Sequence, residues 1–219
     1  MLRLMFSKTG NAVWISHLDT MRLFQRAFKR SGFHLKHTQG FNPRPSVSIA
    51  LPLSVGVESL CELLDFELED QDVTCSEILE KLNNNLIDGI RIIEVYENGA
   101  KIKYLKYLQC DVDLEYDNGI PDHADASICN LFEMPEVWVD KKSKNGIVSQ
   151  NIISMIRNIQ IECLNGDTMR IHAVICCQEP SLNPSQLSAA ISKYLPDLTP
   201  DFVRYRRCQV LDAENRIFR

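Results

Sequence analysis

The first half of the chain alternates between strand-like and helix-like hydrophobic patterns. Residues 2–7 place apolar and polar side chains alternately, which predicts a β-strand. Residues 16–31 follow a helical period and start with Ser-His-Leu-Asp, a capping-box-like sequence in which aspartate replaces the usual glutamate. Strands are also predicted over 46–52, 60–68 and 90–96, a helix from 74 or 76 to 86, and short extended segments over 13–15 and 34–39.

This order of elements (strand, helix, strand, strand, helix, strand) is the ferredoxin-like pattern of the α+β class. It predicts an antiparallel sheet with both helices on one face. We therefore expect residues 1–98 to form one ferredoxin-like unit, which carries a basic helix and a Gly-Phe-Asn-Pro-Arg-Pro loop.

The second half repeats this order with one additional strand. Residues 165–167, Asn-Gly-Asp, are a hairpin signal between predicted strands over 158–164 and 168–177. The other expected elements are strands over 104–116, 136–140 and 202–211 and helices over 122–132 and 183–194. We expect residues 99–219 to form a second ferredoxin-like unit in tandem with the first, with the boundary near 97–100.

Composition and cysteine spacing narrow the class of protein. The eight cysteines form no Cys-x-x-Cys pair, which excludes a zinc ribbon and the Cys-x-x-x-Cys-x-x-Cys loop of radical SAM enzymes. We therefore expect no metal and no cofactor on this chain. No apolar run approaches the roughly 20 residues of a membrane span, and the N-terminus lacks a signal-peptide core. The sequence thus predicts a cytoplasmic protein that has no membrane partner.

The net charge of −5 conceals an uneven distribution of charge along the chain. Residues 1–50 contain eight lysines and arginines but a single acid, whereas residues 51–98 contain two bases and twelve acids. Such asymmetry indicates nucleic acid or another anionic partner for the first block. The alternative is that the two blocks face each other in the fold and neutralise.

The predicted helix over 16–31 separates its side chains by type. Its apolar stripe, which is expected to face the sheet, consists of Leu18, Met21, Phe24 and Phe28. Its basic side chains share a separate arc of about 100° and are Arg22, Arg26, Lys29 and Arg30. Because like charges at this spacing repel, we expect either the acidic stretch 58–72 or a phosphate backbone to offset them.

The start of this helix adds two candidate residues. Ser16 and His17 lie where free backbone N–H groups point outward, and such a helix end suits an anion. His17 has three open roles: donating to a phosphate, acting as an acid or base, or packing within the core.

The segment 37–48 is the most unusual stretch of the chain. A glycine allows a sharp bend, and two prolines stiffen the residues after that bend. A stiff loop would hold Phe41, Asn42 and Arg44 in place at low entropic cost. An aromatic ring, an amide and a guanidinium are the groups that single-stranded nucleotide sites use for stacking, edge recognition and phosphate pairing. The alternative for Phe41 is that its ring is buried and anchors the loop.

Other candidate sites are weaker. The sequence contains no phosphate-binding glycine loop, no zinc-protease motif and no serine-hydrolase motif. Asp65, Glu67 and Glu69 alternate on a predicted strand, which is more typical of a solvated face than of a metal site. Arg204 and Arg206 share one face of the last strand, where they either extend an RNA surface or mark an exposed strand edge.

The stretch from Phe6 to Ser59 resembles a known family. The matching residues are Phe6-Ser7-Lys8-Thr9-Gly10, Trp14-Ile15-Ser16-His17-Leu18-Asp19, Arg22, Arg26-Ala27-Phe28-Lys29-Arg30, Gly40-Phe41-Asn42-Pro43-Arg44-Pro45, Leu53 and Gly56-Val57-Glu58-Ser59. This pattern is similar to the radical SAM-linked protein family, a bacterial domain of unknown function found fused to, or encoded beside, a B12-binding-type radical SAM protein. The chain departs from the family pattern at His37 and Gln39. The resemblance implies a radical SAM protein as partner, with the iron–sulfur cluster on that partner.

Three functions are consistent with these features. The leading hypothesis is a non-catalytic accessory module that presents tRNA or rRNA to a radical SAM enzyme. In it, Arg22, Arg26, Arg30 and Arg44 hold phosphates, Phe41 stacks on a base, and Ser16, His17 and Asn42 form hydrogen bonds. The second is a metal-independent RNase with His17 or His37 as general base; paired ferredoxin-like units also resemble CRISPR repeat-binding RNases at the level of fold. The third is a protein-interaction adaptor whose basic face docks on the radical SAM partner.

Overall fold

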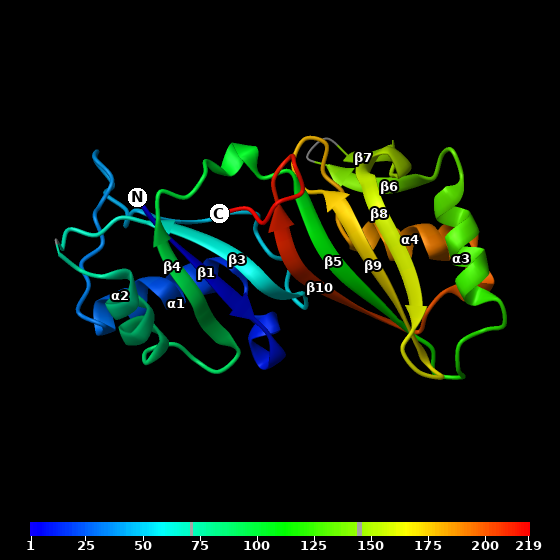
Figure 1. The fold of residues 1–219 in the computed structure, drawn as a ribbon, viewed down its shortest axis with the longest axis horizontal. Helices are drawn as coiled ribbons and strands as arrows, with labels where there is room; N and C mark the ends of the chain where they lie inside the picture. Colours follow the sequence, from blue (N-terminus) through cyan, green and yellow to red (C-terminus); the bar gives the residue numbers. More distant parts are fainter. Residues whose placement is uncertain (71, 144–145) are drawn as a thin grey trace. The chain divides into compact units, whose positions relative to one another are not determined.

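The computed structural model describes residues 1–70, 72–143 and 146–219 (Figure 1). The chain divides into two compact units. The N-terminal unit comprises Met1–Ile102 together with Arg219, and the C-terminal unit comprises Lys103–Phe218. Both units contain helices and antiparallel strands, so the predicted α+β class is confirmed.

The N-terminal unit has the predicted order of elements. These are β1 (Leu2–Lys8), the 3₁₀ helix η1 (Gly10–Trp14), α1 (His17–Arg30), β2 (Val47–Ile49), β3 (Glu58–Phe66), α2 (Cys75–Asn83) and β4 (Ile90–Glu97). Strand β1 pairs antiparallel with both β3 and β4, and β2 pairs antiparallel with β3. The strand order across this unit is therefore β4–β1–β3–β2.

Helices α1 and α2 share one hydrophobic core with this sheet. Phe6 of β1 meets Phe24 of α1 edge to face at 4.7 Å between ring centroids, and Phe28 lies 4.8 Å from Phe66 of β3. Leu18 was expected in this apolar stripe, but its side chain is 65% exposed. It lies in the first turn of α1, and Thr20 and Ala27 complete the buried face instead.

Two predicted extended segments are wrong. Val13 and Trp14 belong to η1, and Ile15 directly follows it, so residues 13–15 form no strand. Lys8 Nζ donates to the carbonyl oxygens of Val13 (3.2 Å) and Ile15 (2.7 Å) and closes the turn. Residues 34–39 form only single bridges, Leu35 to Leu68 and His37 to Pro45. A proline in the facing segment has no N–H to donate, so a ladder cannot continue there.

The C-terminal unit has the strand order β10–β5–β9–β8, with all pairs antiparallel. Its elements are β5 (Tyr107–Glu115), α3 (Ala124–Glu133), β6 (Trp138–Ser143), β7 (Gly146–Asn151), η3 (Ile153–Met155), β8 (Ile156–Cys163), β9 (Thr168–Cys176), α4 (Ser185–Tyr194), η4 (Pro196–Leu198) and β10 (Phe202–Leu211). A further 3₁₀ helix, η2 (Ile102–Tyr104), lies where the two units join in sequence.

Strand β7, which the sequence did not predict, pairs with β6 as a separate two-stranded sheet. Its residues are mostly exposed on both sides, including Ile147 (72%) and Val148 (52%), so it lacks the alternation that reveals a half-buried strand. Inside the unit, the alternate residues of β5 and β9 are buried together with Ile128 of α3 and Ile191 of α4. The other face of β5 and β9 carries polar side chains. No helix of the described residues is long and apolar enough to cross a bilayer.

Candidate nucleic-acid interface

The start of α1 is capped by its own side chains. Ser16 Oγ accepts from the Asp19 backbone N–H at 3.2 Å and donates to Asp19 Oδ2 at 2.7 Å. This bond, with a further one from Arg22, lowers the pKa of the Asp19 carboxyl. A carboxylate of the chain itself therefore stands at the helix end where the sequence suggested an external anion.

His17, which directly follows the capping residue Ser16, faces a small cavity. Its half-buried ring lines a cavity of about 10 Å³, room for one water. Lys8 and Glu62, both buried, also line this cavity. His37 is exposed on the loop after α1 and does not line the cavity, so the two histidines proposed for RNA cleavage do not share it.

Three arginines of α1 line one surface groove of about 370 Å³. They are Arg22, Arg26 and Arg30, each four residues from the next and therefore on one ridge of the helix. Across the groove lie Asn85 and Ile87 from the segment after α2, and the rest of the lining is Ile15, Asp19 and Leu23. The lining thus combines three cations with three apolar side chains, one amide and one carboxylate.

The turn that follows the groove residues Asn85 and Ile87 is held in place by a close backbone approach. The Thr9 N–H donates to the Gly89 carbonyl oxygen at 2.8 Å, and Gly89 has a φ of +83°. A Cβ at position 89 would lie 2.4 Å from the Thr9 carbonyl oxygen, so only glycine fits. The turn that carries Ile87 is therefore held against η1.

The groove arginines are not neutralised by the acidic stretch 58–72. Arg22 pairs with Asp19 at 2.9 Å, but both side chains are more than half exposed. Within the described residues, Arg26 and Arg30 form no ion pair or side-chain hydrogen bond. Three acids of that stretch pair with other bases: Asp65 with Arg3, Glu67 with Lys36 and Asp70 with His34. Two guanidinium groups are consequently available to an anion.

The loop before β2 presents its aromatic ring to solvent. Phe41 is fully exposed, so the alternative in which it anchors the loop from inside is wrong. Asn42 and Arg44 are also exposed. The loop is closed at its base, where the Thr38 N–H donates to the Arg44 carbonyl oxygen at 2.9 Å and the Arg44 N–H donates to Thr38 Oγ1 at 3.1 Å. These three candidate residues do not line the arginine groove.

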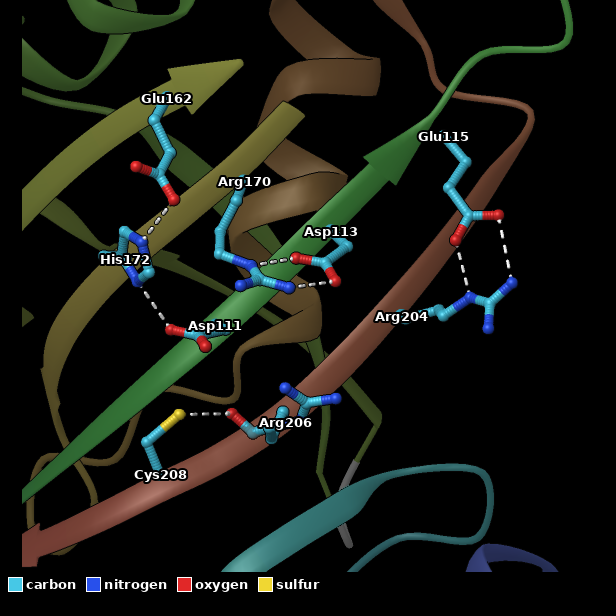
Figure 2. A network of polar contacts seen from close by, with 9 residues as sticks. All are labelled: Asp111, Asp113, Glu115, Glu162, Arg170, His172, Arg204, Arg206 and Cys208. Atoms are coloured by element: carbon cyan, nitrogen blue, oxygen red, sulfur yellow. Dashed lines mark hydrogen bonds and ion pairs between the residues drawn. The ribbon is translucent and has the colours of Figure 1, made fainter. Parts of the chain in front are cut away.

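The C-terminal unit uses its arginines differently, in a polar network that Figure 2 shows. Arg170 of β9 forms two hydrogen bonds to Asp113 of β5, at 2.6 and 2.8 Å, and Arg204 of β10 pairs with Glu115 at 2.5 Å. Arg204 is therefore engaged within its own sheet, which leaves it less suited to extend an RNA surface than the α1 arginines. The signal for this network in the sequence was the alternation of Asp111, Asp113 and Glu115, facing basic residues on both neighbouring strands.

Residues 1–184 match the profile of a bacterial family described as "Uncharacterized protein conserved in bacteria (DUF2344)". The chain belongs to this family. The DUF2344 match confirms the predicted bacterial domain family of unknown function, and its description names no radical SAM protein. No curated protein matches the chain.

Among solved structures, this DUF2344 chain is similar to one titled "Crystal Structure of a Cbf5-Nop10-Gar1 Complex", with 9% identity and a TM-score of 0.48. That match covers 95% of this chain and 48% of the other, so the chain spans about half the length of that relative. A second, titled "Crystal Structure of an Unknown Protein from Galdieria sulphuraria", has 8% identity and a TM-score of 0.27, over 94% and 96% of the two chains. At these scores neither structure identifies a fold or a function for the chain.

His172 gives the network a dependence on pH. Its ring lies between Asp111 (2.7 Å) and Glu162 (2.9 Å), as Figure 2 shows. Burial opposes protonation of the ring, but the hydrogen bonds to Glu162 and Asp111 outweigh it and raise the pKa of His172. A raised pKa in the folded state stabilises the fold below the ordinary histidine pKa, and this contribution is lost as the pH rises through the raised value.

We therefore expect His172→Gln to cost more stability near pH 6 than near pH 8.5. The side chain is 35% exposed, so solvent screening limits the difference to about 1 kcal/mol or less. Urea unfolding of both proteins at the two pH values measures it. An equal loss at both values would show that the ring is neutral in the folded protein.

Proposed function

We propose that this chain is a non-catalytic module that binds RNA through its N-terminal unit and presents it to a separate enzyme. The observation that carries the proposal is the arginine groove, in which Arg26 and Arg30 form no ion pair with the described residues although an acidic stretch is available in the same unit. Unpaired guanidinium groups in a row match the charge of a phosphate backbone.

Further residues are assigned to the same role. Arg22 would exchange its exposed pair with Asp19 for a phosphate, since such pairs contribute little stability. In a second contact region, Phe41 would stack on a base while Asn42 and Arg44 bind a base edge and a phosphate. Ser16 and His17 would contribute only after the Ser16–Asp19 bond is exchanged.

The partner we propose is a radical SAM protein in the cytoplasm, with its iron–sulfur cluster on that protein and tRNA or rRNA as the substrate. The support is the resemblance of residues 6–59 to the radical SAM-linked pattern. We also propose that both units are ferredoxin-like. The support is that both sheets have the same strand order. With the β6–β7 hairpin counted as an insertion, the last strand of each unit lies beside its first strand, followed by its third strand and then its second.

The two other functions have less support. An RNase needs a base beside the bound phosphate, and the groove lining contains no histidine. An adaptor would use the same arginines against carboxylates of the partner protein. RNA binding and protein binding by the isolated chain distinguish these possibilities.

The test is the salt dependence of RNA binding. We expect a single-stranded RNA to bind the purified chain, with the logarithm of the affinity falling against the logarithm of salt concentration with a slope of about −3, since roughly four phosphates are neutralised. A filter-binding titration over a range of potassium chloride concentrations measures the slope. Absence of binding at low salt, or binding that salt does not weaken, would refute the proposal.

A further inference from the structure

Asn85 is a residue of the arginine groove whose side-chain amide has a fixed orientation. Its Nδ2 donates to Ser31 Oγ at 3.1 Å and to the Lys81 carbonyl oxygen at 3.0 Å. A backbone carbonyl can only accept a hydrogen bond, so the atom beside it must be the nitrogen, and the amide cannot turn over. The main chain is held as well, because the Asn85 N–H donates to the Leu82 carbonyl oxygen at 2.9 Å.

These bonds use both hydrogens of the amide and leave its oxygen. Ser31 and Lys81, which receive the hydrogens, do not line the groove, whereas Asn85 does. Since Oδ1 and Nδ2 point in different directions from the amide carbon, Oδ1 is the polar atom left for the groove. Among the residues that the structure describes, this oxygen has no hydrogen-bond partner. Asn85 therefore enters the groove as an acceptor that cannot donate.

The surroundings of Asn85 in the groove suit a nucleotide. The guanidinium groups of Arg22, Arg26 and Arg30 share this lining with Ile87, which is 45% exposed and lies two residues beyond Asn85. The volume of about 370 Å³ lies within the range of pockets that hold small organic ligands. With phosphates at the arginines, an attached base would meet an apolar side chain on its face and an acceptor at its edge.

We infer that Asn85 is a specificity-determining residue of the groove, and that it favours bases that present an amino group. This inference rests on the proposed function. Cytosine carries an amino group, a donor, where uracil carries the O4 carbonyl, an acceptor. Uracil does have one N–H on its edge, but that group lies between two carbonyl oxygens, which the Asn85 oxygen would repel. A freely turning amide could satisfy either base, whereas Asn85 is held by its two bonds.

Two homopolymers of equal length and charge test the inference. Oligocytidylate and oligouridylate of about twelve nucleotides present the same base in every register along the groove. At a slightly alkaline pH, where cytosine is neutral, we expect the wild-type chain to bind oligocytidylate about 2- to 12-fold more tightly, the effect of one neutral hydrogen bond. Filter binding of both RNAs at one salt concentration measures this ratio.

A substitution and a matched control assign the ratio to Asn85. Asn85→Ala removes the acceptor and is expected to bind both RNAs with nearly equal affinity, chiefly through weaker oligocytidylate binding. A general disturbance of the groove would instead weaken both RNAs alike and leave their ratio unchanged. The neighbouring Asn84 is exposed and does not line the groove, so Asn84→Ala should keep the wild-type ratio. Circular dichroism and urea unfolding confirm that both variants are folded.

A second measurement needs no variant of the protein. An oligocytidylate in which hydrogen replaces each amino group lacks the donor, and the wild-type chain is expected to bind it more weakly than the unmodified RNA. Undiminished affinity for this RNA would show that the amino group is not recognised.

The outcomes separate the two proposals. Salt-dependent RNA binding without a preference for oligocytidylate, or with a preference that Asn85→Ala retains, would overturn the assignment of Asn85 and leave the proposed function standing. Failure of the wild-type chain to bind either RNA at low salt would overturn both, including the case in which this surface binds a protein instead.

Discussion

Reversing two charges in the groove, by Arg26→Glu and Arg30→Glu together, is expected to weaken RNA binding by about 1,000-fold. Each substitution removes one attraction between a guanidinium and a phosphate and adds one repulsion between a carboxylate and a phosphate, each of about 1 kcal/mol in water at 4 Å. The two substitutions together therefore cost about 4 kcal/mol of binding free energy, which corresponds to about 1,000-fold in affinity. The slope of affinity against salt should also fall to about −1.4, the value for the two remaining contacts at Arg22 and Arg44. Filter binding at several salt concentrations measures both changes.

A matched control variant makes the same change in net charge, but at residues outside the groove. Arg157 and Lys103 are exposed and belong to the C-terminal unit, so Lys103→Glu with Arg157→Glu should reduce affinity by much less. The groove variant should be as stable as the wild type, because within the described residues Arg26 and Arg30 form no ion pair to lose. Equal losses of affinity in the two variants would show that only the overall charge matters and that the groove is not the site.

Replacing Lys8 by methionine is expected to destabilise the N-terminal unit by about 3–5 kcal/mol. Lys8 is 2% exposed, and burial lowers its pKa while the nearby Glu62 carboxylate opposes that shift. The substitution leaves the Ile15 carbonyl without its Lys8 donor, leaves the Val13 carbonyl with the Gly56 N–H alone, and removes the ammonium that attracts buried Glu62. Urea unfolding followed by circular dichroism measures the loss.

A double-mutant cycle tests the origin of this loss. If the attraction between Lys8 and Glu62 matters, Lys8→Met combined with Glu62→Gln should cost clearly less than the sum of the two single substitutions. Additive costs would assign the effect of Lys8 to the two carbonyl groups alone. A loss below about 1 kcal/mol for Lys8→Met would contradict the expectation altogether.

The periodic parts of the sequence predicted the structure well. The helical period and the cap at Ser16 located α1 to within a residue, and the predicted last strand over 202–211 matched β10. These signals are local, since they arise from the spacing of buried side chains along one element. The arc of basic side chains on α1 followed from the same spacing.

Features that depend on distant residues were not predictable. Nothing local in residues 13–15 reveals that Lys8 closes them into a turn, and nothing near Phe41 decides between an anchored and an exposed ring. The groove needs Ile87 from a segment more than fifty residues after α1, and no periodic signal connects the two. Likewise, the partners of Arg204 became visible only through the register of β10 against β5.

The contact of Gly89 with Thr9 limits how the turn after α2 can change within this family. Because the main chain itself holds the turn after α2 against η1, side-chain rotamers alone cannot move this turn away from η1. A groove of another shape would have to come from other residues at positions 85 and 87, or from another spacing of the arginines, while Gly89 is kept. Relatives with a different residue at 89 would be expected to have a rebuilt turn, and with it a recognition surface of another shape.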